Sequence, residues 1–293
     1  MASRVKVRRD VWTFLVLLLL FSGVFYALVF SVADAAKQWG RYMPLFMWCP
    51  ATAAMTTKVV RDRSLRGLGL GLGRTPYLLL AYGLAAAVCL LPYLIVWFGF
   101  DAFSRSQFLD ALGKAGLPSA LRGPAGVAAV VLVISPLTGL IGAAGEEIGW
   151  RGFLVPRMSA LLGFTKSSLV IGLIWAAWHY PINVALSPLY RPNVPLWYSN
   201  ACFTLLVIGV SFMHTWLRLR SRSVWPSALF HAAGNAFQVV LQVATLENRV
   251  TSYLTTEYGA SFAVVGCLLG LIFWRRRHEV EPLLVPTGPE ALE

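Results

Sequence analysis

Apolar segments long enough to cross a membrane recur along the chain and are separated by short polar stretches. A transmembrane helix needs about 20 mostly apolar residues. The segments near this length predict an all-α bundle of about eight spanning helices, at 11–32, 42–60, 75–100, 125–150, 168–185, 196–217, 224–243 and 260–274. We assign residues 1–274 to a single transmembrane domain and expect the polar, proline-containing tail at 275–293 to be disordered.

The first apolar segment follows basic residues, as the core of a secretory signal peptide also does. Such a core has about 7–15 residues. The stretch from Val11 to Val32 is of spanning length instead. We therefore expect it to be the first transmembrane helix and not a cleaved signal.

Composition agrees with a membrane protein, and the placement of charge predicts its orientation. The chain is 57% hydrophobic and 13% charged, whereas a soluble protein carries roughly 25% charged residues. If the helices alternate in direction, 18 of the 25 lysines and arginines fall on the side of the N-terminus. Cytoplasmic loops carry such an excess, so both termini are expected in the cytoplasm. This bias also accounts for the net charge of +12 without nucleic acid as a partner.

Two connections between the predicted helices could be misread. The glycine-rich stretch 66–74 resembles a phosphate-binding loop, but it lacks the Gly-Lys-Ser/Thr ending and follows no strand. We interpret it as a cytoplasmic connection. The stretch 101–123 is compatible with either a loop or a re-entrant helix.

Ionisable residues within the predicted helices are few, and each costs ~2.5–3.5 kcal/mol at the bilayer centre on insertion scales. Glu146, Glu147 and Arg151 lie at the cytoplasmic end of the fourth predicted helix. Glu147 and Arg151 are four residues apart, so they can form an ion pair on one face. Glu146 is turned about 100° away and is free to face a cavity. The alternative is an anchoring cluster at the membrane surface.

Three histidines lie within the predicted helices. His179 is deep in the fifth, with Trp175 one turn before it, and His231 shares a face of the seventh with Asn235. Each histidine could instead form a structural hydrogen bond between helices. We expect the third, His214, to lie at the membrane interface because Arg218 and Arg220 follow it.

Together, these groups can form a hydrolytic site in the cytoplasmic half of the bilayer. Zinc accepts histidine nitrogens and carboxylate oxygens and leaves a position for water. We therefore predict zinc as a cofactor, with His179 and His231 as metal ligands. The chain contains no HExxH sequence, which excludes the arrangement of soluble zincins.

The motifs Glu146-Glu147-x-x-x-Arg151, Trp175-x-x-x-His179 and His231-x-x-x-Asn235 resemble, in this order, those of the CPBP family. This family, also called Abi, contains CAAX proteases and bacteriocin-processing enzymes. The resemblance covers about 140–240, within a motif-bearing core at 125–243. It implies that Glu146 activates water, that His179 and His231 bind metal or position water, and that Asn235 stabilises the oxyanion.

The resemblance also implies that Glu147 and Arg151 are a supporting pair. Prenyl-protein proteases of the family usually have phenylalanine where this chain has Trp175, and we place Trp175 and Trp178 in the substrate pocket. The implied activity is that of an intramembrane metalloprotease acting on a membrane-presented protein or peptide. A CAAX substrate is lipidated: its cysteine carries a prenyl chain, which would enter laterally from the membrane lipids.

Other functions remain open at this point. In the plasma membrane of a prokaryote, bacteriocin processing, self-immunity or turnover of a membrane protein would fit the family. A non-catalytic membrane scaffold or regulator, or an immunity protein of the same family, would keep the motifs for structure. A transporter could use the buried glutamate and histidines as a proton relay, although the sequence shows no internal repeat of the kind many transporters have.

Overall fold

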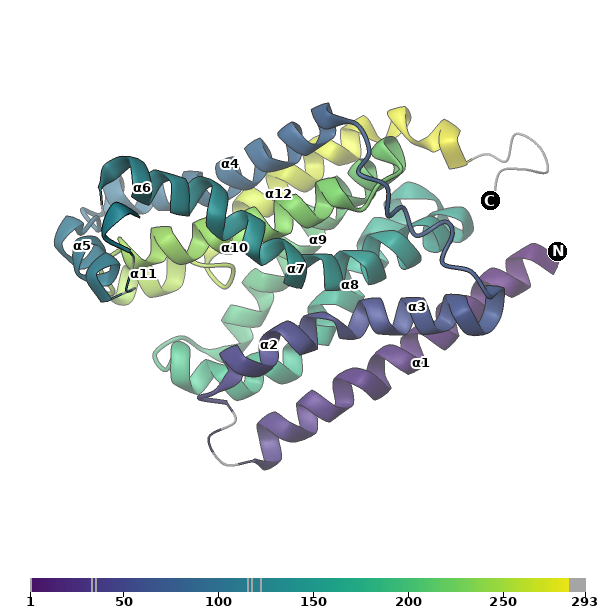
Figure 1. Cartoon of the computed structure of the whole chain (residues 1–293), viewed down its shortest axis with the longest axis horizontal. Coiled ribbons are helices and arrows are strands. Elements are labelled where there is room, and N and C mark those ends of the chain that lie inside the picture. Colours follow the sequence, from purple (N-terminus) through teal and green to yellow (C-terminus); the bar gives the residue numbers. More distant parts are fainter. Residues whose placement is uncertain are drawn as a thin grey trace.

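The computed structural model describes residues 2–32, 34, 36–114, 116, 118–121 and 123–284. Helices pack side by side along one long axis, and the start of α1 and the end of α12 lie at the same end of the bundle (Figure 1). The described residues contain no β-strand, which confirms the all-α prediction. The main helices are α1 (Ala2–Ser31), α2 (Trp39–Met47), α3 (Cys49–Asp62), α4 (Thr75–Gly99), α5 (Arg105–Lys114), α6 (Pro124–Ala129), α7 (Ser135–Glu147), α8 (Val155–Tyr190), α9 (Leu196–Ser221), α10 (Trp225–Val243), α11 (Arg249–Leu254) and α12 (Ala260–Arg275).

Within the described residues, four helical stretches are long and apolar enough to cross a membrane: Arg4–Ser31, Thr75–Gly99, Pro124–Tyr190 and Leu196–Ser221. The third has 67 residues and contains two of the predicted spanning segments, 125–150 and 168–185. The other predicted segments correspond to α2 with α3, to α10 and to α12. The chain is therefore a membrane helix bundle, while the number of eight crossings stays a prediction.

A sharp bend divides α8 into two parts. Gly163 has φ +75°, a conformation open to glycine and unfavourable for other residues. The hydroxyls of Ser159 and Ser167 lie 3.0 Å apart across this bend. Eight residues of a straight helix would separate them by about 12 Å. The bend reverses the chain, so that the part of α8 carrying His179 returns beside the site.

The site glutamates lie at a close approach between helices. A Cβ atom on Gly145 would come within 2.7 Å of the main-chain oxygen of Met47, so only glycine allows α7 to pack this closely on the end of α2. The backbone after Glu147 continues as a π-helix over Ile148–Leu154. Such wider turns often occur at functional sites, and this one directly follows the paired glutamates.

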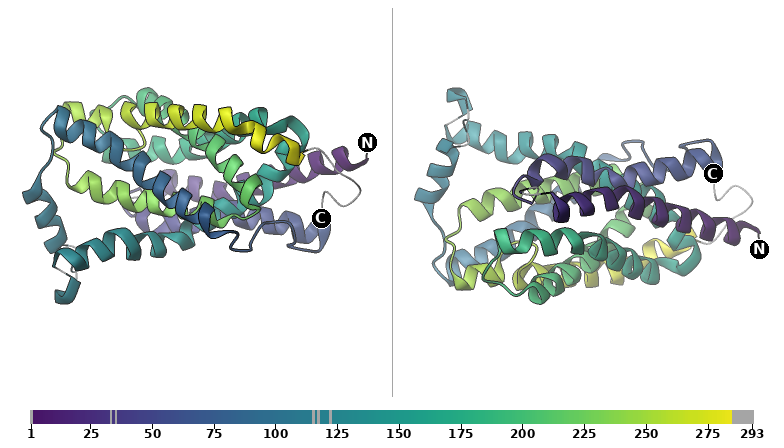
Figure 2. Two further views of the ribbon diagram at one scale, coloured as in Figure 1. Left: turned by 90° about the horizontal axis from the view of Figure 1, so that it is seen from above. Right: turned by 90° about the horizontal axis from the view of Figure 1, so that it is seen from below.

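Two connecting regions differ from simple loops. Residues 105–114 form α5, which lies across one end of the bundle and has no buried residue (Figure 2). Past α12, short 3-10 turns at Arg276–Glu279 and Glu281–Leu284 bury Val280 against the bundle. The expectation of a disordered tail is wrong for this part, because an apolar residue and an ion pair between Arg276 and Glu279 order it. Residues 285–293 lie outside the described part of the chain.

Candidate active site

One cavity of about 290 Å³ brings together residues from all three motifs. Glu146, His179, His231 and Asn235 line it from α7, α8 and α10. Most of the remaining wall is apolar and includes Phe46, Val88, Ile182, Leu186, Phe203, Leu206, Val207, Val210, Phe230 and Phe262. A mostly apolar cavity with a few convergent polar groups is typical of ligand and active sites.

Glu146 is almost fully buried, and its carboxylate is fixed on one side. The indole N–H of Trp175 donates to its Oε2 at 2.8 Å, and that of Trp150 donates to the same oxygen at 3.3 Å. The other oxygen, Oε1, lies 4.0 Å from Nε2 of His231. This separation is too long for a direct hydrogen bond. Two indoles therefore hold one oxygen, and the second faces the imidazole across the cavity.

Glu147 links the first motif to the third and is completely buried. Its Oε1 accepts a hydrogen bond from Nη1 of Arg151 at 3.0 Å and one from Nδ1 of His231, also at 3.0 Å. A carboxylate accepts and does not donate, so the proton on the His231 ring belongs on Nδ1. In the neutral ring, Nε2 then carries a lone pair and faces Glu146.

His179 is oriented by its own helix. Its Nδ1 lies 3.0 Å from the carbonyl oxygen of Trp175 and must donate a hydrogen bond to it. Nε2 is then the ring nitrogen that remains free to bind another group. Trp178 and Phe203 pack edge-on against the ring, at 4.7 and 5.1 Å between centroids. Asn235 is exposed and lines the same cavity, one turn after His231.

The two tryptophans predicted for the substrate pocket have different positions. Trp175 lines the cavity, and the guanidinium of Arg151 lies 4.2 Å from the centre of its ring. Trp178 is not among the lining residues. It stacks on Phe46 at 4.1 Å and donates to Ser22 of α1. The placement of Trp178 in the pocket was wrong, because this side of α8 packs against α1 and α2.

His214 is a site residue that the sequence analysis assigned to the membrane interface. The structure places it fully buried on the cavity wall, with Nδ1 3.9 Å from Oε2 of Glu147. The nearby Arg218 and Arg220 suggested an interfacial position, but Arg218 is itself buried. The signal that could have found His214 is its place inside an apolar helix, where an ionisable residue is by default a functional candidate.

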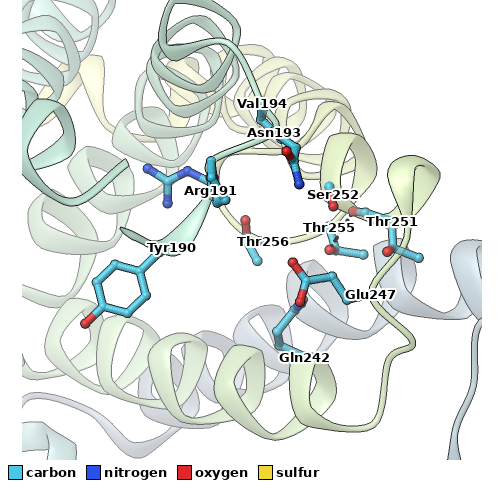
Figure 3. Close-up of a pocket in the computed structure, with 11 residues that line it drawn as sticks. Tyr190, Arg191, Asn193, Val194, Gln242, Glu247, Thr251, Ser252, Thr255 and Thr256 are labelled. Atoms are coloured by element: carbon cyan, nitrogen blue, oxygen red, sulfur yellow. Dashed lines mark hydrogen bonds between the residues drawn. The ribbon is translucent and has the colours of Figure 1, made fainter. Parts of the chain in front are cut away.

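A second, smaller pocket lies away from the motif residues, in the loops that follow α8 and α10. It has a volume of about 50 Å³ and is lined mainly by polar side chains, among them Arg191, Gln242, Glu247 and Thr251 (Figure 3). None of Glu146, His179 and His231 contributes to it. The chemistry predicted from the motifs therefore belongs to the larger cavity.

His179 and His231, the ligands of the predicted zinc site, both line the cavity. Among the described residues, no group of three or more His, Cys, Asp or Glu side chains is placed to hold a metal ion. His231 directs one ring nitrogen to Glu147, and His179 directs one to a main-chain oxygen. Each keeps Nε2 to offer as a ligand, and metal-binding histidines usually donate their other ring N–H to a carboxylate or a main-chain oxygen in this way. Zinc therefore stays a prediction.

Comparisons with known proteins agree with the motifs. Residues 128–237 match the family described as type II CAAX prenyl endopeptidase, Rce1-like. Over 133 residues the chain is 29% identical to CAAX prenyl protease 2 of Methanococcus maripaludis. This alignment covers 44% of the chain and 46% of the relative, so the chain spans about half the length of the curated relative it matches. Residues 128–237 contain all three motifs, so this part of the chain is similar to the CAAX protease family.

Proposed function

We propose that this protein is an intramembrane endopeptidase in which Glu146 activates water for hydrolysis of a peptide bond. The observation that carries the proposal is the 4.0 Å separation between Oε1 of Glu146 and Nε2 of His231 inside one cavity. Both atoms are acceptors when the His231 proton lies on Nδ1. One water molecule can donate a hydrogen to each of them, which directs its lone pairs toward a substrate.

The reaction follows from these positions. Glu146 takes a proton from the water as the new carbon–oxygen bond forms at the scissile carbonyl. Asn235 donates its amide N–H to the carbonyl oxygen, which becomes an oxyanion. Glu146 then returns the proton to the leaving nitrogen as the carbon–nitrogen bond breaks. The products are a carboxylic acid and an amine, which exchange a proton to give a carboxylate and an ammonium group.

Zinc bound by His179 and His231 remains a sequence-based prediction, and no step of the proposed reaction depends on it. Bound zinc would supply a Lewis acid for the carbonyl oxygen and the water. The metal content of purified protein tests this prediction, beside the variants His179→Ala and His231→Ala. About one zinc per chain that is lost in both variants would support a shared metal site.

The substrate class is also part of the proposal. The relative from Methanococcus maripaludis is named for a CAAX prenyl substrate, and the apolar wall of the cavity suits an extended peptide with apolar side chains. We expect a membrane-presented protein or peptide that can be lipidated, cleaved in the plasma membrane of a prokaryote.

A quenched fluorescent peptide that ends in a farnesylated cysteine and three further residues tests the activity. Protein in lipid nanodiscs should cleave it, and the same peptide without the farnesyl group measures the need for lipid. Glu146→Ala should abolish cleavage, because no other carboxylate faces His231 Nε2 in the described part of the chain. Cleavage that survives Glu146→Ala would contradict the proposed base. A wild-type protein that cleaves neither peptide would favour the scaffold or regulator.

A further inference from the structure

His214 lies on the cavity wall, but it takes part neither in the proposed reaction nor in the predicted zinc site. It is completely buried, yet neither Nδ1 nor Nε2 has a hydrogen-bond partner among the described residues. Leaving a buried polar group without a partner costs about 1–3 kcal/mol. The ring borders the cavity, so a molecule that occupies the cavity can supply the partner.

Aromatic neighbours fix the position of this ring. Trp175 and Phe230 contact it edge-on, at 5.9 and 5.1 Å between centroids and with interplanar angles of 75° and 88°. Both neighbours also line the cavity. The ring is therefore packed as rigidly as a core side chain while its nitrogens stay unpaired.

Glu147 orients one of the two nitrogens. Its Oε1 already accepts from Arg151 and His231, whereas Oε2 has no partner among the described residues and lies 3.9 Å from Nδ1 of His214. This distance is too long for a hydrogen bond, but the negative charge of the carboxylate favours the proton of a neutral His214 on Nδ1. Nε2 is then an acceptor. One glutamate thus faces two histidines, His231 on one oxygen and His214 on the other.

A peptide bound in this cavity needs acceptors for its backbone N–H groups. The wall is mostly apolar, and burying an unpaired peptide N–H is costly. We propose that His214 contacts the substrate, with Nε2 accepting a hydrogen bond from a backbone N–H of the bound peptide and Nδ1 turned toward Glu147. This inference rests on the proposed function, since it assumes that a peptide occupies the cavity.

Binding of the fluorescent farnesylated peptide tests the proposal without turnover if all variants carry Glu146→Gln. His214→Phe keeps the aromatic packing and removes both nitrogens. We expect its Kd to rise about three- to tenfold, the range of one hydrogen bond. His214→Gln should recover most of the affinity, because its terminal amide reaches the position of Nε2 and offers an acceptor.

Thr215→Val is the matched control. Thr215 is the next residue on α9, is also fully buried, and has a hydroxyl without a partner among the described residues, but it does not line the cavity. Its substitution should leave the Kd unchanged. Unchanged binding by a well-folded His214→Phe protein would overturn the proposal and would mean that the ring meets only water. An equal rise in Kd for Thr215→Val would also overturn it, because the effect would then not require the cavity.

If the His214→Phe protein does not fold, a second measurement still tests the proposal. In protein labelled with ¹⁵N-histidine, the Nε2 signal of His214 is assigned by its loss in His214→Gln, and the peptide should shift it. An unshifted signal at saturating peptide would overturn the proposal.

If the peptide binds but wild-type protein does not cleave it, the proposed function fails while the contact is still tested. If the protein cleaves the peptide and this signal stays fixed, only the contact fails. Wild-type protein that binds no peptide would overturn both.

Discussion

Glu147 of α7 accepts a hydrogen bond from His231 of α10 at 3.0 Å, between residues 84 positions apart in the chain. The same oxygen accepts from Arg151, so one buried carboxylate compensates the arginine and sets the tautomer of the histidine. Glu146, the preceding residue, neither pairs with Arg151 nor hydrogen-bonds to His231. Two adjacent glutamates thus have separate roles, one in holding the site together and one in facing the cavity.

Glu147→Gln should destabilise the protein as well as inactivate it. The amide keeps the size of the side chain but leaves the buried Arg151 without a counter-charge, and breaking a buried ion pair costs about 3–5 kcal/mol. We expect a clearly lower midpoint of thermal unfolding in detergent and no peptide cleavage. Glu146→Gln is the matched control, because Glu146 has no ion pair with Arg151. It should lose cleavage and keep a midpoint near that of the wild type. Equal midpoints for both variants would contradict this division of roles.

Trp175→Phe should slow the reaction without unfolding the protein. Phenylalanine keeps a ring near Arg151 but cannot donate to Oε2 of Glu146, which the indole now does at 2.8 Å. A hydrogen bond to a charged group is worth about 1.5–3 kcal/mol. If most of it orients the base, kcat should fall about tenfold or more, while KM and the unfolding midpoint change little. An unchanged kcat would show that Trp150 alone is sufficient to orient Glu146.

The sequence predicts the parts of the site that depend on helical spacing. Glu147 and Arg151 pair at the expected four-residue spacing, and His231 and Asn235 line one cavity. These placements need only the geometry of a single helix. The segments of the bundle also follow from the apolar pattern, because each apolar stretch became helical.

The sequence could not predict contacts that depend on how the helices pack against each other. Trp178 and His214 differ from expectation for this reason. Trp178 faces α1 through Ser22, and His214 is enclosed by Trp175 and Phe230. The π-helix after Glu147 also rotates the following residues relative to an α-helix, and no simple pattern of the sequence marks it.

Gly73→Ala should loosen the glycine-rich connection between α3 and α4. Gly73 has φ +76°, and a Cβ there would lie 2.8 Å from the Cβ of Ser223. The left-handed conformation alone costs roughly 1–2 kcal/mol for an alanine. The variant should therefore have a lower unfolding midpoint. Gly71→Ala is the control, since its φ is ordinary and nothing lies within 4 Å of the added atom. A similar loss in both variants would mean that the composition of the connection matters and not the strained position.

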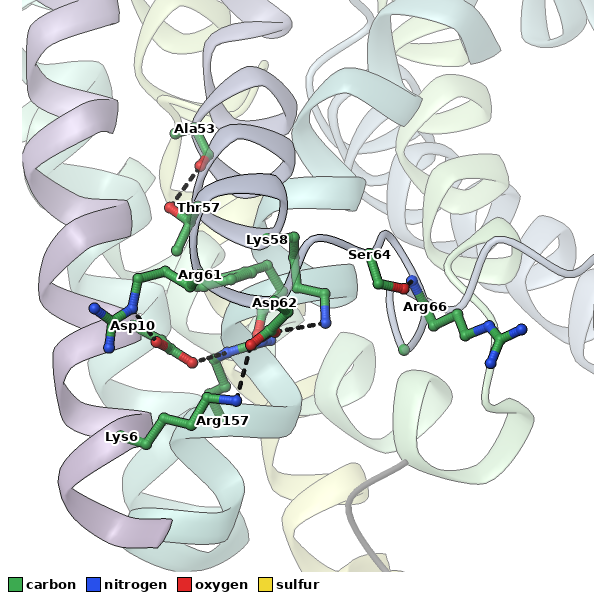
Figure 4. A network of polar contacts seen from close by, with 12 residues as sticks. Lys6, Asp10, Ala53, Thr57, Lys58, Arg61, Asp62, Ser64, Arg66 and Arg157 are labelled. Atoms are coloured by element: carbon green, nitrogen blue, oxygen red, sulfur yellow. Dashed lines mark hydrogen bonds and ion pairs between the residues drawn. The ribbon is translucent and has the colours of Figure 1, made fainter. Parts of the chain in front are cut away.

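Acid should weaken the end of the bundle where α1, α3 and α8 meet. There Asp62 pairs with Lys58 and Lys6 at 2.8 Å each and lies 3.7 Å from Arg157 (Figure 4). Burial raises the pKa of the Asp62 carboxyl, but the hydrogen bonds from Lys58 and Lys6 outweigh it and lower the pKa to about 2. An unfolded aspartate has a pKa of about 3.9. The ionised group therefore stabilises the fold above about pH 4, and this contribution is lost as the pH falls toward 2.

Thermal unfolding at pH 7, 5 and 3 measures this contribution. The wild-type midpoint should fall more between pH 5 and pH 3 than that of Asp62→Asn, which cannot titrate at this position. Asp110→Asn should behave as the wild type, because Asp110 pairs with Lys114 on an exposed face of α5 and its side chain is 64% exposed. Exposed pairs contribute little to stability. Parallel decreases for the wild type and Asp62→Asn would show that other carboxylates cause the acid sensitivity, and that the Asp62 network stabilises the folded state no more than an exposed pair does.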